Sequence, residues 1–583
     1  MVRQRARKRP SPPPHQAHSA RGRRRGVSKK GTSAVESAFL LGTQKGLLVT
    51  VLTLFLARVA SAAFNIIHDC DETYNYWEPL HYLIYNEGFQ TWEYSPKFAL
   101  RSYLYITLHY MFAKPLALLR VVVLGNTKLA VFFGVRGFLG LVSAVTEGYL
   151  VFSLAKTGRR TESKLLLCFL ATSAAMFVSS TSFLPGTFSM YFFTLATAGV
   201  LQQNQTLVIV SCAVSVIVGW SVTAIAAIPH ALWVLGTASF VRSLRTAVLL
   251  TASLLILTFA FDSYFYGRYV LSLHSFLSYN VFGSGDSALY GVEDSTFYLR
   301  NGLNNLNVLL PLSFAAPCFL LLRICLSSEK REQAKNLLAA LSPQWFWLLA
   351  ITMLPHKEER FMYVVYPEIL LAAAYTVVQA GNSLAGVIGM FRGHVRKVFF
   401  TGALIITTML SASRVGALLW NYDANMKIYM RLNQHLHTEG VGESCVVCVG
   451  SEWYEYPSSF FIPSGCGMEF VRSGFDGVLP AHYNASLGGT RYAAEYLNDM
   501  NEADDRQFME NERACDFLIS LKYDDKLLPK RQRIKGKTLE IVHELPYVQS
   551  SASKALYRAL FIPFVSAHKL VYNSYALYKS KEG

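Results

Sequence analysis

Three carboxylates follow shortly after the first apolar segment of this chain. That segment, residues 46–64, is long enough to cross a membrane, and Asp69, Asp71 and Glu72 come directly after it. Charged side chains at a membrane edge are costly to desolvate, and where they persist they usually bind a polar substrate or move protons. The cluster therefore predicts a membrane enzyme or a transporter rather than a scaffold.

The loop that contains these carboxylates, residues 65–100, is also rich in aromatic side chains. A sugar acceptor needs a carboxylate to take its hydroxyl proton, and sugar rings stack on aromatic faces. The alternative is an interfacial loop whose aromatic residues form a belt at the membrane surface, which explains the tryptophans but not the carboxylates. We therefore predict a functional loop with the following acceptor or sugar contacts: Asp69, Trp77, Glu78 and Trp92.

A second group of charges precedes a later apolar run, in Leu354-Pro-His-Lys-Glu-Glu-Arg-Phe361. His356, Lys357 and Arg360 could clamp a phosphate and stabilise the charge that develops on a phosphate leaving group. A helix that begins here would add the positive end of its dipole. The alternative is a charge-capped helix end in which Glu358 and Glu359 pair locally, and charge alone does not decide between the two.

The elements that must position these residues are membrane helices. The 583 residues are 52% hydrophobic and only 16% charged, and the mean hydropathy is +0.27. Long apolar runs recur and are continuous rather than alternating, which predicts a polytopic α-helical membrane protein and excludes a β-barrel. The candidate spans are residues 46–64, 101–123, 128–155, 164–182, 187–202, 206–240 (as one span or two short helices), 247–261, 303–325, 342–355, 364–380 and 398–418.

Charge divides the chain into three parts. Residues 1–45 form a basic, proline-containing arm that we expect to be disordered and cytosolic, which explains the net charge of +17 without nucleic acid. Residues 46–418 hold the spans, and residues 419–583 form a lumenal domain. Loops that carry Lys and Arg favour the cytosol, so the first loop and residues 355–363 lie on the opposite, lumenal side. The number of spans between residues 101 and 240 stays open.

The last part has the pattern of a smaller α/β or β-rich domain. Residues 445–450 form an apolar run followed by glycine, which predicts a strand and a turn. A Cys-x-x-Cys pair lies in this run, but no second pair follows at zinc-site spacing, so structural disulfides or buried thiols are favoured. The four cysteines concerned, in three possible connectivities, are Cys445, Cys448, Cys466 and Cys515. Asn484-Ala-Ser486 is a candidate glycosylation site, whereas Asn204 lies too close to two spans.

Two blocks of sequence resemble a known family. His356-Lys-Glu-Glu-Arg-Phe361 resembles the signature of the mannosyltransferases of the GT-C superfamily that use a lipid-phosphate-linked mannose. The block from His68-Asp-Cys-Asp-Glu-Thr-Tyr-Asn-Tyr-Trp-Glu-Pro79 to Arg101-Ser-Tyr103 is similar to the α-1,2-mannosyltransferases of asparagine-linked glycosylation. Further matches are Ser182-Phe-Leu-Pro185, Asp262-Ser-Tyr-Phe-Tyr-Gly267, Tyr279-Asn-Val-Phe282, Tyr290-Gly291, Asn301-Gly302, Cys448-Val-Gly-x-Glu-Trp-Tyr454 and Pro457-Ser-Ser-Phe460.

The resemblance extends from about residue 46 to the end of the chain, with three departures. The family tends to show Glu-Pro-Trp where this chain has Glu293-Asp-Ser295, and Gly-Trp-Pro where it has Gly219-Trp-Ser221. The loop of residues 270–278 differs too. These positions concern the lipid-sugar or glycan subsite, so we add Glu293 to the expected acceptor or sugar contacts.

The resemblance implies an inverting transfer of mannose in the lumen of the endoplasmic reticulum. The donor would be dolichyl phosphate mannose and the acceptor a dolichol-pyrophosphate-linked oligosaccharide, extended in α-1,2 linkage at two steps. Asp71 would be the general base, with Glu72 as the second candidate or as a carboxylate that tunes it. His356, Lys357 and Arg360 would bind the donor phosphate, helped by Arg101. No nucleotide site or metal cage is visible, so no cofactor or metal is expected.

Two alternatives remain beside this hypothesis. One is a related mannosyltransferase that acts on a glycosylphosphatidylinositol precursor, against which the extended first-loop block argues. The other is a proton-coupled transporter that uses Asp69, Asp71 and Glu72 as a relay. A transporter predicts carboxylates inside the spans and repeated halves, whereas these carboxylates lie in a loop and no repeat is evident. How two acceptor branches are recognised, and the oligomeric state, do not follow from the sequence.

Overall fold

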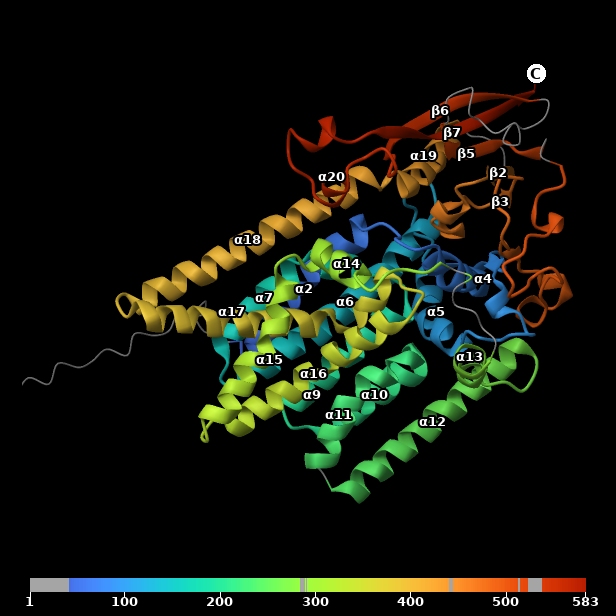
Figure 1. Ribbon diagram of the computed structural model, residues 1–583. Coiled ribbons are helices and arrows are strands. Elements are labelled where there is room, and N and C mark those ends of the chain that lie inside the picture. The colour runs from blue at the N-terminus through green and yellow to red at the C-terminus, as the bar shows by residue number, and fades with distance from the viewer. Residues whose placement is uncertain are drawn as a thin grey trace, which may run out of the picture.

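A bundle of long helices carries a β-sheet at one end (Figure 1). The computed structural model describes residues 41–237, 239–283, 289, 291–439, 444–511, 514–522 and 537–582. Most of the predicted basic arm, residues 1–40, and Tyr290 of the family block lie outside the described residues. The architecture is the predicted one: a polytopic helical part followed by a smaller α/β part.

Among the described residues, seven helical segments are long and apolar enough to cross a membrane. They agree with the apolar runs of the sequence, because each run is continuous over the length that a membrane requires. The seven are α2 (Gln44–Phe64), α6 (Thr127–Lys156), α12 (Phe240–Tyr266), α15 (Leu309–Leu326), α16 (Arg331–Met353), η7 with α17 (Glu359–Val365 and Tyr366–Ile388) and α18 (Arg392–Asn421).

The remaining apolar runs form shorter helices. The run of residues 206–240 is broken after Gly219, so the expectation of two short helices is confirmed. The run of residues 164–182 is also divided, at Ser173. These helices are α5 (Tyr103–Leu118), α7 (Arg160–Thr172), α8 (Ala174–Ser179), α9 (Pro185–Leu201), α10 (Gln205–Val214), α11 (Ala224–Thr237) and α14 (Phe297–Leu306).

A buried ion pair joins the first two long helices. Arg58 of α2 lies 2.5 Å from Glu147 of α6, and both side chains are almost fully buried. The same guanidinium donates to the backbone oxygen of Leu170 at 2.7 Å. A charge inside a span is tolerated when it faces another helix and finds a partner there. The pair therefore holds α2 against α6, and α2 leads into the first loop.

The first loop is a folded unit rather than an open connection. It contains α3 (Cys70–Glu72), the π turn η1 (Thr73–Trp77) and α4 (Glu78–Tyr85). Pro79 lies in the first turn of α4, where proline is favoured. Strand β1 (Phe89–Gln90) and the 3-10 turn η2 (Trp92–Tyr94) follow. Strand β1 pairs antiparallel with β4 (Ala481–His482), so the loop is joined to the C-terminal part.

Two further π turns occur near the first loop. One is η3 (Ser215–Gly219), between α10 and the 3-10 turn η4 (Ser221–Thr223), and the other is η5 (Ser278–Phe282), after α13 (Ser272–Leu277). A π turn contains one residue more than the α-helical turn it replaces, and such turns are frequent at functional sites. Helix α12 ends at Gly267, whose φ of 67° is the left-handed value that glycine adopts without strain.

The C-terminal part is built on a five-stranded sheet of order β3-β2-β5-β7-β6. Strand β2 is parallel to both of its neighbours, β3 and β5, and β7 is antiparallel to β5 and β6. The predicted strand at residues 445–450 is therefore confirmed. The elements are α19 (Ala424–Glu439), β2 (Cys445–Val449), β3 (Cys466–Phe470), β5 (Phe517–Leu521), β6 (Lys537–Val548), α20 (Ala555–Ala559) and β7 (Tyr572–Glu582).

Two disulfides select one of the three possible connectivities. Cys445 is bonded to Cys466 and Cys448 to Cys515. Both bonds join neighbouring parts of the sheet, because Cys445 and Cys466 are register partners in β2 and β3, and Cys515 precedes β5. The Cys-x-x-Cys pair thus serves two separate structural bonds, not one redox or metal site.

This pairing can be tested with a variant that removes one bond. In Cys448→Ala, we expect a non-reduced digest to contain the peptide of Cys445 linked to that of Cys466, with Cys515 as a free thiol. The reciprocal variant Cys445→Ala should link Cys448 to Cys515. Mass spectrometry of the digests checks both, and a Cys445–Cys515 link would contradict the pairing.

Candidate active site

Asp71 and Glu72 are neighbours in the chain but face different surroundings. The side chain of Asp69 caps the short helix α3 by accepting the backbone N–H of Asp71 at 2.8 Å. The side chain of Asp71 is 35% exposed, whereas Glu72 is 2% exposed. Successive helical residues point about 100° apart, which explains the division. Asp71 is therefore open to a substrate, and Glu72 is enclosed.

Glu72 holds the first loop against the helix bundle. Its Oε1 accepts the indole N–H of Trp77 at 3.1 Å and the backbone N–H of Phe183, just before α9, at 2.9 Å. Burial raises the pKa of this carboxyl, although the charge of Arg136 and these hydrogen bonds oppose the increase. Trp77 is fully buried and packs on Phe132, with ring centroids 4.3 Å apart. Neither Trp77 nor Glu72 faces a space that a sugar could enter.

Glu78 holds the same loop to the C-terminal part. It is fully buried, and its carboxylate accepts the backbone N–H of Phe89 at 3.0 Å. Ser459 donates to the same carboxylate from its backbone N–H at 2.6 Å and from its hydroxyl at 2.8 Å. Burial raises the pKa of Glu78, against the effect of these bonds. The structure gives Glu78 a fastening role instead of the expected contact with a sugar.

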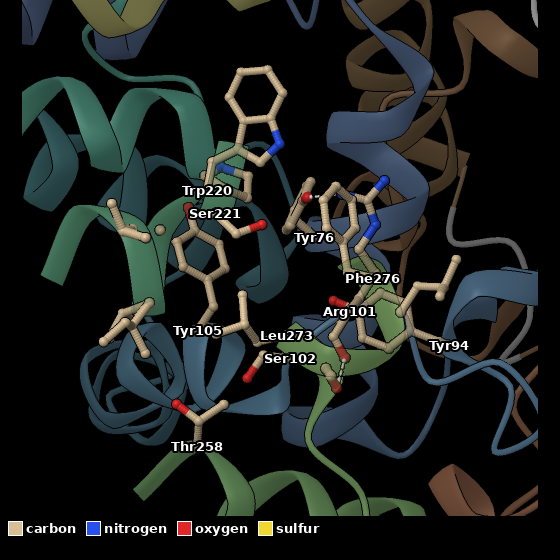
Figure 2. A pocket seen from close by; sticks show the side chains of 17 residues that line it. Tyr76, Tyr94, Arg101, Ser102, Tyr105, Trp220, Ser221, Thr258, Leu273 and Phe276 are labelled. Carbon is tan, nitrogen blue, oxygen red and sulfur yellow. Dashed lines mark hydrogen bonds between the residues drawn. The ribbon is translucent and has the colours of Figure 1, made fainter. Parts of the chain in front are cut away.

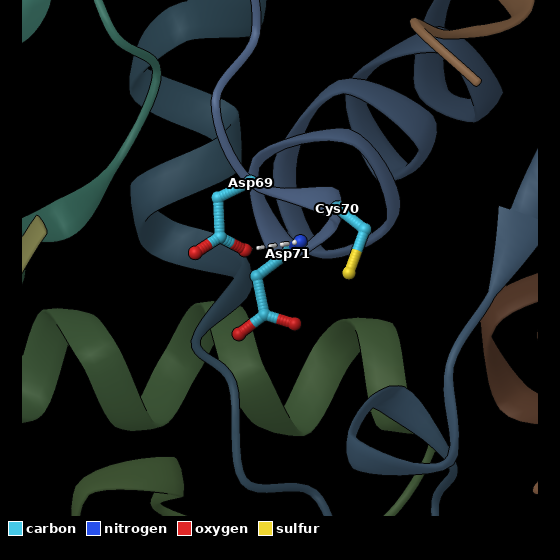
Figure 3. A group of neighbouring side chains, drawn as sticks. All are labelled: Asp69, Cys70 and Asp71. Carbon is cyan, nitrogen blue, oxygen red and sulfur yellow. Dashed lines mark hydrogen bonds between the residues drawn. The ribbon is translucent and has the colours of Figure 1, made fainter. Parts of the chain in front are cut away.

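Arg360 joins the two groups of charged residues that the sequence singled out. Its Nη2 lies 2.5 Å from Asp71 Oδ2, its Nε lies 3.2 Å from Asp69 Oδ2, and it also contacts Glu358. Figure 3 shows the carboxylates of Asp69 and Asp71 beside each other in the turn. The candidate base and the candidate phosphate-binding arginine, 289 positions apart, are thus in direct contact.

Burial and charge act in opposite directions on the carboxyls around Arg360. Burial raises the pKa of Asp69 to about 7, because the lowering effect of Arg360 is offset by the charges of Glu358 and Asp71. Burial also acts to raise the pKa of Glu358, but Arg360 and His356 outweigh it and lower that pKa to about 2. Burial therefore dominates the pKa of Asp69, whereas the neighbouring cations dominate the pKa of Glu358.

The same turn offers three atoms that could bind a cation. The ligand atoms of Asp69, Cys70 and Asp71 all lie within 4.8 Å of one another (Figure 3). Arg360 already contacts both carboxylates, so a positive charge is present where a metal would have to bind. A divalent cation would have to displace this guanidinium.

His356 and Lys357 fasten the loop that leads to Arg360. His356 contacts Glu358 Oε1 through Nε2 at 2.7 Å and the backbone oxygen of Gly291 through Nδ1 at 3.0 Å. Its hydrogen bond to Glu358 raises the pKa of His356 above its usual value, although burial opposes this. The Nζ of Lys357 donates to the backbone oxygens of Glu293 at 2.8 Å and Leu354 at 2.5 Å. These bonds use two of the three donors of the Lys357 ammonium.

These residues surround a cavity of about 460 Å³, which we name the outer cavity. Four segments line it: residues 67–70 of the first loop, residues 291–293, residues 356–358, and Tyr454 with Glu455 from the C-terminal part. Its rim carries hydroxyl, carboxylate and cationic groups. Such a mixture suits a hydrated, polar ligand more than an apolar one.

A second, narrower cavity of about 60 Å³, the inner cavity, lies beside Arg101 (Figure 2). Arg101 donates to Glu93 Oε1 at 2.8 Å and to the hydroxyl of Tyr76 at 2.9 Å. Further lining residues come from several elements, among them Tyr105 of α5, Gly219 of η3 and Thr258 of α12. Helix α12 is apolar and long enough to span a membrane, so a helix of membrane character forms part of the wall of this cavity.

Asp71 lines neither cavity but is linked to both. It follows directly after the outer-cavity residues 67–70, and its charge also acts on Arg101, which lines the inner cavity. Burial alone would lower the pKa of Arg101, but Glu93, Tyr76 and Asp71 outweigh it and raise that pKa. Burial raises the pKa of Tyr76 to about 12, although the charges of Arg101 and Arg360 both lower it. The charges of Arg101, Arg360 and Asp71 thus all affect the pKa of the Tyr76 hydroxyl.

The structure does not gather the four predicted phosphate-binding cations at one point. Arg101 lines the inner cavity, His356 and Lys357 line the outer cavity, and Arg360, which contacts Asp71, lines neither. The sequence could not distinguish these positions, because charge type and spacing do not reveal which partner each cation has.

Three further predicted residues lie toward the surface. Trp92 is half-buried and packs on Phe98 and Tyr279, with ring centroids at 5.1 Å and 5.6 Å. Glu293 is exposed beside Arg300, 3.7 Å away, on the rim of the outer cavity. Asn484 is exposed, and its Oδ1 accepts the backbone N–H of Ser486 at 3.1 Å. Glycosylation of Asn484 stays a prediction.

Four residues that line a cavity or contact a residue lining one had no role assigned from sequence patterns. Tyr454 and Glu455 contribute to the outer cavity, and Tyr76 and Glu93 surround Arg101. Tyr76 and Glu93 lie within the sequence block that resembles the family, but the sequence did not predict that both contact Arg101. For Glu455 the sequence held no signal, because its proximity to Asp69 arises from the docking of the C-terminal part on the first loop.

Comparison with known proteins assigns most of this chain to one group. Residues 49–463 match the model of a family described as the Alg9-like mannosyltransferase family. An alpha-1,2-mannosyltransferase ALG9 of Arabidopsis thaliana is 36% identical over 538 residues, which are 90% of each chain. Its Homo sapiens counterpart is 33% identical over 550 residues, 91% of this chain and 88% of that protein.

A solved structure aligns with this chain at low similarity. ArnT from Cupriavidus metallidurans, in a crystal structure with undecaprenyl phosphate, aligns with a TM-score of 0.43 and 8% sequence identity. The alignment covers 73% of this chain and 86% of that one.

The division of labour between Asp71 and Glu72 predicts different effects on stability. Glu72→Ala leaves two buried N–H donors without an acceptor, which costs about 1–3 kcal/mol per group. We expect the unfolding temperature of the purified protein to fall by several degrees, as measured by tryptophan fluorescence. Asp71→Ala is the matched control, and we expect a smaller decrease because its side chain is partly solvated. Equal decreases would contradict the assignment.

Proposed function

Because this chain belongs to the Alg9-like mannosyltransferase family, we propose that it transfers mannose with Asp71 as the general base. It is an enzyme, an α-1,2-mannosyltransferase of the GT-C type, like relatives that share 31–36% of its sequence over most of its length. Neither the glycosylphosphatidylinositol alternative nor the transporter finds comparable support among these relatives.

The chain is a multi-pass membrane protein whose family implies a lipid-linked sugar donor and a lipid-linked oligosaccharide acceptor. We propose dolichyl phosphate mannose as the donor and dolichol-pyrophosphate-linked oligosaccharide as the acceptor, at two steps of its assembly. The membrane would be that of the endoplasmic reticulum, with the active site in the lumen and the N-terminus in the cytosol. The positions of the Lys- and Arg-rich loops support this orientation.

The observation that carries the proposal is the partly exposed Asp71 carboxylate, which is paired with Arg360 and linked to residues of both cavities. The inner cavity lies beside a helix of membrane character, so it suits the phosphate end of a lipid-linked donor. The outer cavity is larger and polar, so it suits the acceptor glycan. A carboxylate linked to both can take a proton from an acceptor hydroxyl that faces the donor sugar.

The transfer is one displacement at the anomeric carbon. The acceptor 2-hydroxyl oxygen attacks C1 of mannose as Asp71 accepts its proton, and the bond from C1 to the phosphate oxygen breaks on the opposite face. The β-linked donor thereby gives an α-linked product, and the polyprenyl phosphate leaves with the electron pair. The base must be ionised and close to the hydroxyl at that moment.

Arg360 connects donor binding to the base. Its guanidinium is shared among Asp71, Asp69 and Glu358, so one positive charge holds three carboxylates together in the resting site. We infer that the donor phosphate takes Arg360 from these carboxylates, with Arg101 as its second cation, and that Arg360 then stabilises the leaving group. Asp71 thereby faces the acceptor without its ion pair. His356 and Lys357 hold the loop that presents Arg360.

A defined lipid-linked oligosaccharide tests this function directly. With dolichyl phosphate mannose as the donor, Asp71→Asn should lower the transfer rate by at least 100-fold, because general-base catalysis contributes about 10²–10⁴-fold. Binding of the donor should persist, since Arg360 and Arg101 remain. Linkage analysis of the wild-type product should show one α-1,2-linked mannose per step.

The matched control is Glu72→Gln, which keeps the carbonyl acceptor for Trp77 and Phe183. It should retain most of the transfer rate. Substantial turnover by Asp71→Asn, or a stronger loss in Glu72→Gln, would reject Asp71 as the base. No α-1,2 product from the wild-type protein would reject the function itself.

We also propose that the reaction needs no metal cofactor, because Arg360 supplies positive charge at the two carboxylates a cation would use. Extensive treatment with EDTA should leave the rate of mannose transfer unchanged within error. Arg360→Ala should lower the rate by at least about 100-fold in the same assay, with or without added Mg²⁺ or Mn²⁺. Loss of activity with EDTA that either ion restores would contradict the proposal.

A further inference from the structure

The connection between β6 and β7 is far longer than a hairpin needs. The strands pair as far as Val548 and Tyr572, and residues 549–571, the β6–β7 segment, extend beyond them. Two-stranded hairpins usually close with two to five residues. The base of the segment is tied by the backbone bond from Gln549 N–H to Val571 at 2.8 Å and by Ser553. The segment is thus a folded excursion from the sheet.

The excursion lies on the last turns of α18 (Figure 1). The backbone N–H of Phe561 donates to the oxygen of Ser413 at 2.9 Å, and the Ser413 hydroxyl donates back to Phe561 at 2.9 Å. The rings of Phe561 and Trp420 also meet, with centroids 5.7 Å apart. Ser413 lies about 12 Å along the axis from the helix end at Asn421, at about 1.5 Å per residue. The segment therefore reaches back along the helix.

Helix α18 is a candidate span whose apolar side chains the protein itself does not cover. Only 11% of its most apolar window is buried, and Ile405 and Met409 are 52% and 67% exposed. Side chains of this kind on a spanning helix face lipid. Trp420, 59% exposed in the last turn, is of the type that gathers at the membrane–water interface. The docking place of the segment is therefore the edge of the membrane.

The β6–β7 segment has the composition of a segment that binds at the membrane–water interface. Phe564 is 94% exposed, Leu556 56%, and Ile562 and Val565 both 38%. Its charged residues are all basic, because residues 549–571 contain Lys554, Arg558 and Lys569 but no Asp or Glu. Apolar side chains with basic neighbours bind the interface of membranes that contain anionic lipid.

We propose that the β6–β7 segment is a membrane-surface anchor that inserts Phe564 and its apolar neighbours among lipids beside α18, with the basic residues on anionic headgroups. This site is independent of the proposed catalytic residues. It also has a structural link to the outer cavity: Tyr547, at the end of β6, donates its hydroxyl to Glu455. Lipid contact at the segment would fix the sheet that supplies one wall of that cavity.

Photocrosslinking of the full-length protein in lipid nanodiscs tests this anchor. The photoreactive residue p-benzoylphenylalanine replaces Phe564, and the bilayer is phosphatidylcholine with about 20% phosphatidylserine, which supplies the anionic headgroups. The same replacement of Met409, on the outer face of α18, is the positive control. Replacement of Ile541, 39% exposed near the far end of β6, is the negative control.

We expect phospholipid adducts by mass spectrometry at positions 564 and 409 and none at 541. Adducts at 409 without any at 564 would overturn the proposal, and so would adducts at 564 that contain protein instead of lipid. The adducts are measured without any assay of mannose transfer, so failure of the catalytic proposal would leave this test intact.

The basic residues give a second measurement. In the variant Lys554→Glu/Lys569→Glu, the lipid adduct at position 564 should fall by about fivefold or more in anionic nanodiscs, because each lysine near such a surface contributes about that factor. The matched variant Lys522→Glu, at the end of β5, should leave the adduct unchanged. Equal adduct yields in the double variant and the wild type would exclude the anionic contact.

Discussion

Two buried carboxylates hold the first loop in place, and the rest of the site depends on them. Glu72 binds the loop to the start of α9, and Glu78 binds it to Ser459 of the C-terminal part. A buried carboxylate without hydrogen-bond partners would cost folding free energy. Glu72 therefore requires the contact of the loop with the start of α9, and Glu78 requires its contact with the C-terminal part. These two carboxylates therefore hold the loop against the helices and against the C-terminal part, and Asp71 lies next to Glu72 in this fixed loop.

The positions of the helices could be predicted from the sequence because membrane spans are continuous apolar runs that need no knowledge of contacts. The division of labour within the first loop could not. Asp71, Glu72 and Glu78 look alike in sequence, and only the packing of distant segments shows which of them faces a cavity. The same holds for Cys445 and Cys448, whose partners are set by strand order, and for Lys357, which serves backbone oxygens.

The arginines of the candidate site are already paired with carboxylates, which outnumber them. Arg360 is matched by Asp69, Asp71 and Glu358, and Arg101 by Glu93. An unpaired charge at this depth would be costly to desolvate, so each of these arginines has a carboxylate partner in the resting protein. In the proposed reaction the donor phosphate replaces these partners, which a neutral sugar could not do because it carries no charge.

The three π turns have a consequence for the ancestry of the site. Two of them supply residues to the inner cavity, Tyr76 from η1 and Val216 to Gly219 from η3, and η5 begins shortly after its lining residue Phe276. A π turn arises when one residue is inserted into an α-helix, and it rotates everything beyond it by about 100°. Insertions of this size are a simple route by which a regular helical bundle acquires a cavity. Alignments of relatives with single-residue gaps at these turns would record that history.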